Sequence, residues 1–310
     1  KYKKVLLFNL EDKHGDLNGE YPCMDDKRFV MTLLDFNNLF KSKLSSKIET
    51  NELDEFFFWL IEHYCNFSRM NYILNSNFNI SKVQEEKLIN SIDLLMNDMP
   101  IQYVIGETNF MDLVFKLNNN VLIPRPETEE LVNWIINDKH VNKNILDIGT
   151  GSGCIAISLS KNLNNCNVLG WDINEDVIKI ANQNAIINNV KASFEISDIT
   201  KPKFLNEKFD VLVSNPPYIT NNEKKLTPNN VKSFEPHSAL FVEDDDPLFF
   251  YKKILEFAIF NLKSNGFLYL EINENFSEEV LKLLKDNGFY DIQLKKDFRL
   301  KNRMVKGIKK

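Results

Sequence analysis

The sequence has few cysteines, no long apolar run and no excess of positive charge, and each absence narrows the possible protein class. The four cysteines form no CxxC pair, so we interpret them as reduced thiols and assign no metal ion. They are Cys23, Cys65, Cys154 and Cys166. No segment approaches the roughly 18 apolar residues of a membrane span, and no apolar signal-peptide core follows the basic start. We therefore expect a cytoplasmic protein without membrane contact.

The net charge argues against a nucleic-acid ligand. Lys and Arg together number 38 and Asp and Glu 44, which gives a formal charge of -6. Proteins that bind the phosphate backbone usually carry a basic domain or stripe. We expect no direct contact with nucleic acid, although a local basic patch is compatible with this total. The length of 310 residues suits one large domain with a smaller one, and we expect a monomer.

A helical pattern occupies the first third of the chain. Residues 1–30 precede that pattern, and we interpret them as an extension that is either native or added by a misplaced start. Residues 31–105 repeat apolar positions at helical spacing and predict a small helical domain. One predicted helix carries Leu53, Phe56, Phe57, Leu60, Ile61 and Tyr64. Pro100 is expected to end the last helix, because proline removes a backbone donor.

A hairpin linker is predicted at residues 106–125. Two extended pieces, 109–113 and 114–117, are followed by the turn signal Asn118-Asn119-Asn120. Pro126 and the acidic residues after it then mark the start of a helix.

An α/β domain is predicted at residues 126–310. Beyond residue 142 short apolar strands alternate with helices, such as those expected at 176–188 and 248–262. Such alternation is typical of parallel strands joined by right-handed crossovers, with helices on both faces of the sheet. The predicted strands are 145–148, 168–171, 193–196, 210–214 and 267–272, with weaker ones near Ile292 and Val305.

A glycine-rich turn follows the first strand of this domain. Gly149, Gly151 and Gly153 have GxGxG spacing, which permits a tight turn and lets ligand atoms approach the backbone. A plain strand-to-helix turn can look the same, so the spacing alone is weak evidence. Asp172 ends the next strand about 20 residues later, where a carboxylate can accept hydrogen bonds from both ribose hydroxyls. Together they predict a site for a nucleoside cofactor.

Two residues after the third strand add to this site. The carboxylate of Asp198 can contact an adenine amino group, although a helix N-cap explains this residue equally well. Ile199 offers a backbone N–H and an apolar wall. A dinucleotide would occupy the same crevice, so the fourth strand has to discriminate between the two cofactor classes.

The fourth strand ends in Asn215-Pro216-Pro217-Tyr218, which hydride transfer does not need. An amide nitrogen is a poor nucleophile, so an enzyme that methylates it must orient it. The Asn215 side-chain oxygen and the Pro216 carbonyl can both accept hydrogen bonds from one NH2 group. Tyr218 offers an aromatic face, with its hydroxyl expected to reach outward to water. The tetrapeptide therefore predicts methyl transfer from S-adenosylmethionine to a planar nitrogen, without distinguishing an amide from adenine.

With these motifs in view, the chain resembles the N5-glutamine methyltransferases that modify peptide chain release factors. The resemblance runs from about residue 31 to the C-terminus. Its most specific part is the run Ile-Pro-Arg-Pro-Glu-Thr-Glu at 123–129, which adenine-N6 methyltransferases with a similar tetrapeptide lack. The segments that carry it are 100–107, 122–129, 145–153, 213–218 and 234–236.

The resemblance implies a fold and an activity. The fold is a Rossmann-like class I S-adenosylmethionine-dependent methyltransferase domain, with a seven-stranded sheet whose last strand is antiparallel. A small helical domain for substrate recognition and a β-hairpin linker precede it. The implied substrate is the glutamine of the Gly-Gly-Gln motif in release factors. An adenine-N6 nucleic-acid methyltransferase and a non-catalytic cofactor-binding module are the alternatives.

The resemblance and the motifs together give a set of candidate site residues. Catalysis is assigned to Asn215, Pro216 and Tyr218, and glutamine binding also to Pro217. Phe110 either lines the pocket, as an aromatic residue does in relatives, or belongs to the hairpin core. Cofactor contacts are assigned to Gly149, Thr150, Gly151, Ser152, Gly153, Asp172, Asp198, Ile199 and Asn215.

Two positions depart from the family pattern. Ile199 stands where some relatives have Trp, so we expect less stacking beside the adenine. Leu300 stands where the family usually has Gly in a tight turn before Arg303, a turn expected to lie away from the transfer chemistry. The long connection at 219–247 is expected to cover the site.

Overall fold

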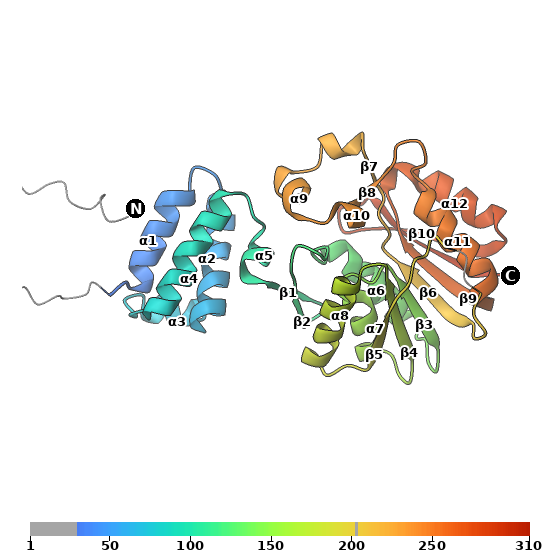
Figure 1. The fold of residues 1–310 in the computed structure, drawn as a ribbon, viewed down its shortest axis with the longest axis horizontal. Helices are drawn as coiled ribbons and strands as arrows, with labels where there is room; N and C mark the ends of the chain where they lie inside the picture. Colours follow the sequence, from blue (N-terminus) through green and yellow to red (C-terminus); the bar gives the residue numbers. More distant parts are fainter. Residues whose placement is uncertain (1–29, 202–203) are drawn as a thin grey trace, which may run out of the picture.

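The computed structural model describes residues 30–201 and 204–310. The predicted extension at residues 1–30 therefore lies outside the described residues, apart from Val30. Two bodies lie side by side in Figure 1, a bundle of helices and a larger α/β domain. None of the helices in the described ranges is long and apolar enough to cross a membrane.

The N-terminal bundle is built around phenylalanine and leucine side chains. Phe36, Phe40 and Phe57 are fully buried together, while Phe56 and Tyr64 pack on their edge. Thr32 begins the first helix with a capping box, in which its hydroxyl accepts from the Asp35 N–H. The helices are α1 (Leu33–Leu44), α2 (Thr50–Cys65), α3 (Arg69–Leu74), α4 (Lys82–Met96) and α5 (Ile101–Ile105). Pro100 does not end α4, which stops at Met96, but stands at the N-cap of the short α5.

The linker is a hairpin, but its turn is not where the sequence pattern placed it. Strands β1 (Glu107–Phe110) and β2 (Leu113–Lys116) pair antiparallel, with Met111 and Asp112 between them. Both turn residues have positive φ, 50° and 59°. Tight hairpin turns of this kind favour Asn and Gly, so a Met-Asp pair gave no turn signal and the predicted break between 113 and 114 was wrong.

The large domain contains the predicted seven-stranded sheet. Its strand order is β10-β11-β9-β6-β3-β4-β5, and β11 runs antiparallel to both of its neighbours. The strand bounds agree with the predicted ones to within two residues, except that β9 begins five residues earlier. They are β3 (Asn144–Ile148), β4 (Asn167–Asp172), β5 (Ala192–Ile196), β6 (Phe209–Ser214), β9 (Leu262–Glu271), β10 (Phe289–Lys296) and β11 (Asn302–Lys309).

Helices cover both faces of this sheet (Figure 1). One core cluster joins α6 (Pro126–Asn137) and α7 (Cys154–Asn162) to one face, near α8 (Glu175–Ile187). A second joins α11 (Phe249–Asn261) and α12 (Ser277–Asp286) to the other. The chain runs outward from β3 through β4 to β5 and then returns to place β6 on the other side of β3. A crevice at the carboxyl ends of strands is expected where the order reverses in this way, so β3 and β6 locate the site.

Candidate active site

The first part of the site is the glycine loop, residues 149–153, which connects β3 to α7. Gly149, Gly151 and Gly153 have φ values of 74°, 55° and 81°, a region that side chains disfavour. The N–H groups of Gly149 and Thr150 both donate to the Trp171 carbonyl at 2.8 Å, which holds the loop against β4. A Cβ at Gly149 or Gly151 would meet nothing within 4 Å, so open space lies directly over the backbone there.

Asp172 lies beside this loop at the end of β4. The Gly151 N–H donates to one carboxylate oxygen at 3.1 Å, and the Asn174 N–H donates to the other at 3.2 Å. Burial raises the pKa of Asp172, while these backbone donors oppose the shift. The carboxylate is thus fixed next to the open space, where it can accept hydrogen bonds from the hydroxyls of a nucleoside.

Below the glycine loop lies a fully buried carboxyl, Asp147. Its Oδ2 accepts a hydrogen bond from the Thr150 hydroxyl at 2.6 Å, and burial raises its pKa to about 7. Thr150 therefore uses its hydroxyl on Asp147 and its N–H on Trp171, which fixes the loop from below. The Ser152 side chain is buried as well. A ligand can therefore reach the exposed backbone of the loop, but not the side chains of Thr150 and Ser152.

Asp198 and Ile199 lie in a turn after β5. The Thr200 N–H and hydroxyl donate to Asp198 Oδ1 at 2.9 Å and 2.6 Å, and the hydroxyl bond is the main cause that lowers the pKa of Asp198. No helix follows in the described residues before β6, so the N-cap interpretation of Asp198 was wrong. Ile199 packs on the core cluster that contains Trp171, which places an apolar side chain near the end of β4.

The tetrapeptide leaves β6 at the neighbouring strand end. The Ser214 hydroxyl donates to the Ile148 carbonyl at 2.6 Å and so ties the ends of β6 and β3 together. Asn215, Pro216 and Tyr218 then line a cavity of about 590 Å³, which we call the acceptor cavity. Its walls also include Arg125, Glu127, Glu271, Arg299 and Arg303.

A chain of hydrogen bonds holds the Asn215 side chain. Its Nδ2 donates to the Thr128 hydroxyl oxygen at 3.2 Å, and that hydroxyl donates to Glu271 Oε2 at 2.7 Å. The Tyr218 hydroxyl donates to Glu271 Oε1 at 3.0 Å. We call these four residues the acceptor network. Because the NH2 end of Asn215 is used on Thr128, its carbonyl oxygen is the end that remains for a ligand.

Part of this network was not foreseen from the sequence. Tyr218 points its hydroxyl inward to Glu271, so the expectation that it reaches out to water was wrong. Thr128 and Glu271 were not among the predicted site residues. Both are almost fully buried. A carboxylate at the end of the apolar strand that ends in Tyr269-Leu270-Glu271 was a usable signal, because burying such a charge is costly without a role.

Arg303 completes the electrostatic surroundings of the network. Burial raises the pKa of Glu271, whereas the bonds from Thr128 and Tyr218 and the charge of Arg303 oppose that rise. Burial also raises the pKa of Tyr218 well above its ordinary value, so this hydroxyl stays protonated. The Arg303 guanidinium carbon lies 5.9 Å from the centre of the Tyr218 ring and within the range of a cation–π contact.

The turn that contains Leu300 supports Arg303. Leu300 has a φ of 64°, a left-handed conformation that favours glycine. The turn also carries Asp297, which accepts from the Arg303 Nε at 3.2 Å. The expectation that this turn lies away from the transfer chemistry was therefore wrong, since it positions an arginine that contacts Tyr218.

Phe110 lies elsewhere. It is buried in a core cluster, where its ring meets Phe115 edge-on at 6.0 Å. It is not among the residues that line the acceptor cavity. The structure therefore favours the hairpin-core interpretation of this residue.

The segment 219–247 forms one wall of the acceptor cavity, and we call it the lid segment. It contains β7 (Ile219–Thr220), α9 (Asn229–Phe234), α10 (His237–Leu240) and β8 (Phe241–Val242). Leu226, Val231 and Leu240 of this segment line the cavity. The buried Glu235 fastens the lid segment to the linker, because it accepts from the Arg125 guanidinium at 2.5 Å.

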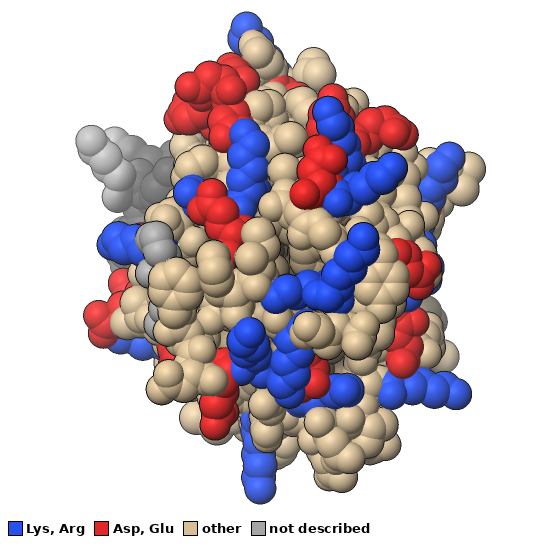
Figure 2. All heavy atoms as spheres, turned by 90° about the vertical axis from the view of Figure 1, so that its right-hand side faces the viewer, with Lys and Arg blue, Asp and Glu red and all other residues tan. Residues whose placement is uncertain are grey.

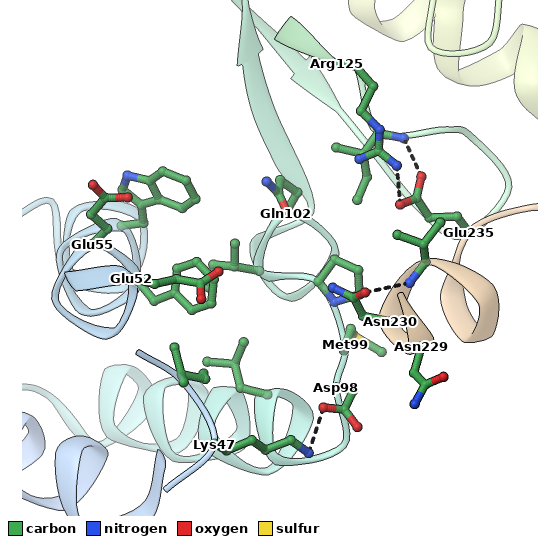
Figure 3. Close-up of a pocket in the computed structure, with 18 residues that line it drawn as sticks. Lys47, Glu52, Glu55, Asp98, Met99, Gln102, Arg125, Asn229, Asn230 and Glu235 are labelled. Atoms are coloured by element: carbon green, nitrogen blue, oxygen red, sulfur yellow. Dashed lines mark hydrogen bonds and ion pairs between the residues drawn. The ribbon is translucent and has the colours of Figure 1, made fainter. Parts of the chain in front are cut away.

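A second cavity of about 540 Å³ adjoins the first (Figure 3). In the close-up, Glu52 and Glu55 of α2 lie on one side and Asn229 and Asn230 of α9 on the other, with Gln102 of α5 between them. Arg125 and Val231 line both cavities, so the two share a wall. A protein chain that enters the acceptor cavity thus has a neighbouring surface on the N-terminal bundle.

Comparison with known proteins agrees with this arrangement. Residues 139–307 match the model of a methyltransferase domain, and residues 38–106 match that of the PrmC N-terminal domain. A release factor glutamine methyltransferase from Flavobacterium psychrophilum is 43% identical over 281 residues, which cover 89% of this chain and 99% of the relative. The chain belongs to the release factor glutamine methyltransferases. A second member, from Bacteroides thetaiotaomicron, is 40% identical over 227 residues, or 73% of this chain and 82% of that one.

A solved structure supports the fold alone. The catalytic domain of hMettl16, determined in complex with MAT2A 3'UTR hairpin 6, aligns with a TM-score of 0.50 at 15% identity. The alignment covers 73% of this chain and 82% of that one. The resemblance drawn from the sequence motifs and the predicted class I methyltransferase fold are both confirmed.

Proposed function

We propose that this enzyme methylates the side-chain amide nitrogen, N5, of the glutamine in the Gly-Gly-Gln motif of release factors. Its relatives are named for glutamine methylation of release factors. The observation that carries the proposal is the orientation of Asn215, whose NH2 group donates to Thr128 and whose carbonyl oxygen is left for the acceptor. An oxygen placed there suits a ligand that presents N–H groups.

S-adenosylmethionine is the cofactor of this methyltransferase, and when bound it supplies a methyl group already activated on a sulfonium. The open space over Gly149 and Gly151 fits a ligand that lies close to the backbone. We assign its binding to the glycine loop and to the carboxylate of Asp172, with Asp198, Ile199 and Asn215 at its border. In this assignment Asp172 accepts hydrogen bonds from the ribose hydroxyls.

The acceptor side has to orient a weak nucleophile. The Asn215 oxygen and the Pro216 carbonyl accept the two N–H bonds of the glutamine amide and thereby fix the direction of its nitrogen. As positive charge develops on that nitrogen, the same two oxygens stabilise it. Tyr218, with Pro217 beside it, supplies a flat surface for the planar amide. Tyr218 stays protonated and is engaged by Glu271, so the proton passes to solvent rather than to this side chain.

Recognition of the protein substrate is assigned to the N-terminal bundle and the second cavity. Trp59, Glu52 and Gln102 line that cavity, and Trp59 is 41% exposed. Tryptophan is among the residues that protein interfaces favour. A release factor bound here would lie next to the acceptor cavity, because both cavities share Arg125.

The adenine-N6 alternative is not favoured, since the family is that of glutamine methyltransferases. Figure 2 shows basic side chains across the middle of the face opposite the N-terminal bundle, with acidic ones mainly toward its rim. A local basic patch therefore exists, and the absence of nucleic-acid binding stays a prediction that a filter-binding assay would test. The monomeric state and the cytoplasmic location also stay predictions.

The proposal is tested by locating the methyl group. Purified enzyme is incubated with S-adenosylmethionine and a release factor, and the digested release factor is analysed by mass spectrometry. We expect one methyl group on the motif glutamine, and none when that glutamine is replaced by asparagine. Enzyme that binds the cofactor but leaves the glutamine unmodified would contradict the proposal.

A further inference from the structure

Two almost fully buried residues, Thr128 and Glu271, fix the orientation of the Asn215 side chain. Thr128 is 2% exposed and Glu271 is 1% exposed. They come from α6 and β9, while Asn215 follows β6, so three separate elements meet at this point. Burying a carboxylate at such a junction is costly, which calls for a role that a neutral side chain would not fill.

We propose that Thr128 and Glu271 are positioning residues that decide which end of the Asn215 amide faces the acceptor. This inference rests on the proposed function. Its basis is the direction of the protons along the chain from Glu271 to Thr128 to Asn215.

An ionised carboxylate only accepts hydrogen bonds, so the Thr128 hydroxyl must give its proton to Glu271. The Thr128 oxygen can then only accept a hydrogen bond, so the end of the Asn215 amide that faces it must be a donor. Asn215 meets this requirement only with its NH2 toward Thr128. The direction set at Glu271 is therefore passed to the oxygen that faces the cavity.

The reverse orientation fails at both ends. The Asn215 oxygen would face the Thr128 oxygen, which has no proton left, and the Asn215 NH2 would face the NH2 of the glutamine. Leaving polar groups unpaired beside the reacting nitrogen in this way opposes methyl transfer. In this arrangement Glu271 acts on the acceptor through Thr128 and Asn215.

Several charged or titratable groups surround Glu271. Some of them favour its ionised form and others disfavour it. Burial raises the pKa of Glu271; the charge of Arg303 on β11 opposes that rise, and the charge of Glu127 on α6 adds to it. Tyr218 donates to Oε1, and the Tyr251 hydroxyl of α11 donates to the Glu271 backbone carbonyl at 3.4 Å. Protonation of Glu271 supplies a donor that can turn the Thr128 hydroxyl around, and the orientation of Asn215 is then no longer fixed.

The matched pair Thr128→Val and Thr128→Ser tests this role. Valine has nearly the same shape without the hydroxyl and leaves the Asn215 NH2 group unpaired, so we expect kcat for methyl transfer to fall about 10- to 100-fold. The affinity for S-adenosylmethionine and the KM for the release factor should change little. Serine keeps the hydroxyl, so Thr128→Ser should have a kcat close to that of the wild type. A Thr128→Val enzyme with wild-type kcat would overturn the proposal.

Glu271→Gln tests the other end of the hydrogen-bonded chain. The glutamine amide can donate to the Thr128 oxygen, so the Thr128 hydroxyl no longer has to donate to residue 271. We expect a fall in kcat of similar size, and the double variant with Thr128→Val should be no slower than the slower single variant. Losses that multiply in the double variant would mean that Glu271 acts independently of Thr128, contrary to the proposal. Each sample is first checked for cofactor affinity and cooperative melting, so a folding defect in one variant leaves the others to decide.

The pH profile at saturating cofactor gives a readout that a merely structural role would not move. In the wild type kcat should fall toward low pH as Glu271 becomes protonated, whereas Glu271→Gln should lack this acid limb. An unchanged limb in the variant would contradict the proposal. If the wild type left the release factor unmethylated, the proposed function would fail. If the wild type methylated the release factor and the variants did so equally well, only the positioning role would fail.

Discussion

The two sides of the active site are built from different parts of the chain. On the cofactor side, a backbone loop with open space over two glycines lies beside one carboxylate, Asp172. On the acceptor side, four side chains form a hydrogen-bonded network around the buried Glu271. The cofactor side depends on local conformation, whereas the acceptor side depends on contacts between distant elements. Substitutions on the two sides should therefore separate binding of the cofactor from transfer of the methyl group.

The largest expected effect is on the acceptor side. Asn215→Ala removes the oxygen that fixes the glutamine nitrogen, and we expect kcat to fall by roughly 100- to 1000-fold. Cofactor affinity should change much less, because the glycine loop and Asp172 are untouched. Single-turnover transfer and calorimetric cofactor binding on one preparation measure both quantities. Activity that survived this change would show that Asn215 does not orient the acceptor.

The buried carboxyl under the glycine loop should affect stability through pH. The pKa of Asp147 is raised to about 7 in the folded chain, so the folded state holds this proton more tightly than the unfolded state. Its contribution to the free energy of unfolding is complete below pH 4 and is lost as the pH rises to about 7. Asp147→Asn should not show this loss of stability between pH 4 and pH 7. The free-energy change with pH should differ between the two proteins by a few kcal/mol, at about 1.4 kcal/mol per unit of pKa. Urea unfolding of both proteins from pH 4 to pH 8 measures it, and a constant difference between them would refute the assignment.

A smaller effect is expected for Asp172→Asn on the cofactor side. Loss of charged hydrogen bonds to the ribose should weaken cofactor binding by about 1.5 to 3 kcal/mol, or roughly 10- to 100-fold in Kd. At saturating cofactor kcat should stay near the wild-type value. Asp176→Asn, on the exposed start of α8, is the matched control and should change neither quantity. A fall in kcat that saturation cannot restore would show that the two sides are not separable.

The smallest effect concerns the turn behind Arg303. Leu300 is 76% exposed and has a φ of 64°, so its side chain contributes strain and little burial. Leu300→Gly should raise the free energy of unfolding by about 1 kcal/mol. Leu300→Ala keeps a Cβ in the same conformation and should gain nothing. A loss of stability in the glycine variant, measured by urea unfolding, would show that the turn is not strained.

The same contrast explains which features could be predicted from the sequence. The glycine loop and Asp172 follow consecutive strands, so strand periodicity was enough to place them together. Asn215 and Thr128 are 87 residues apart, and Thr128 and Glu271 are 143 apart. Only the completed sheet brings such residues into contact, and a single sequence contains no signal for that pairing.

Local chemistry misled the prediction in two further places. The hairpin turn at Met111-Asp112 contains no glycine or asparagine, yet both residues have positive φ where the paired strands β1 and β2 meet. Tyr218 was expected to face water because its hydroxyl is polar, but a buried carboxylate offers it an acceptor. In both cases contacts between elements overrode the preference of a short segment.

In the proposed mechanism, the Asn215 oxygen and the Pro216 carbonyl hold the glutamine nitrogen. A crystal structure of the enzyme with S-adenosylhomocysteine and a Gly-Gly-Gln peptide tests it most directly. We predict that the side-chain nitrogen of the glutamine lies within hydrogen-bond distance of both oxygens, with the Asn215 Nδ2 still on Thr128. A glutamine bound through its carbonyl oxygen to Asn215, or bound outside the acceptor cavity, would contradict the account.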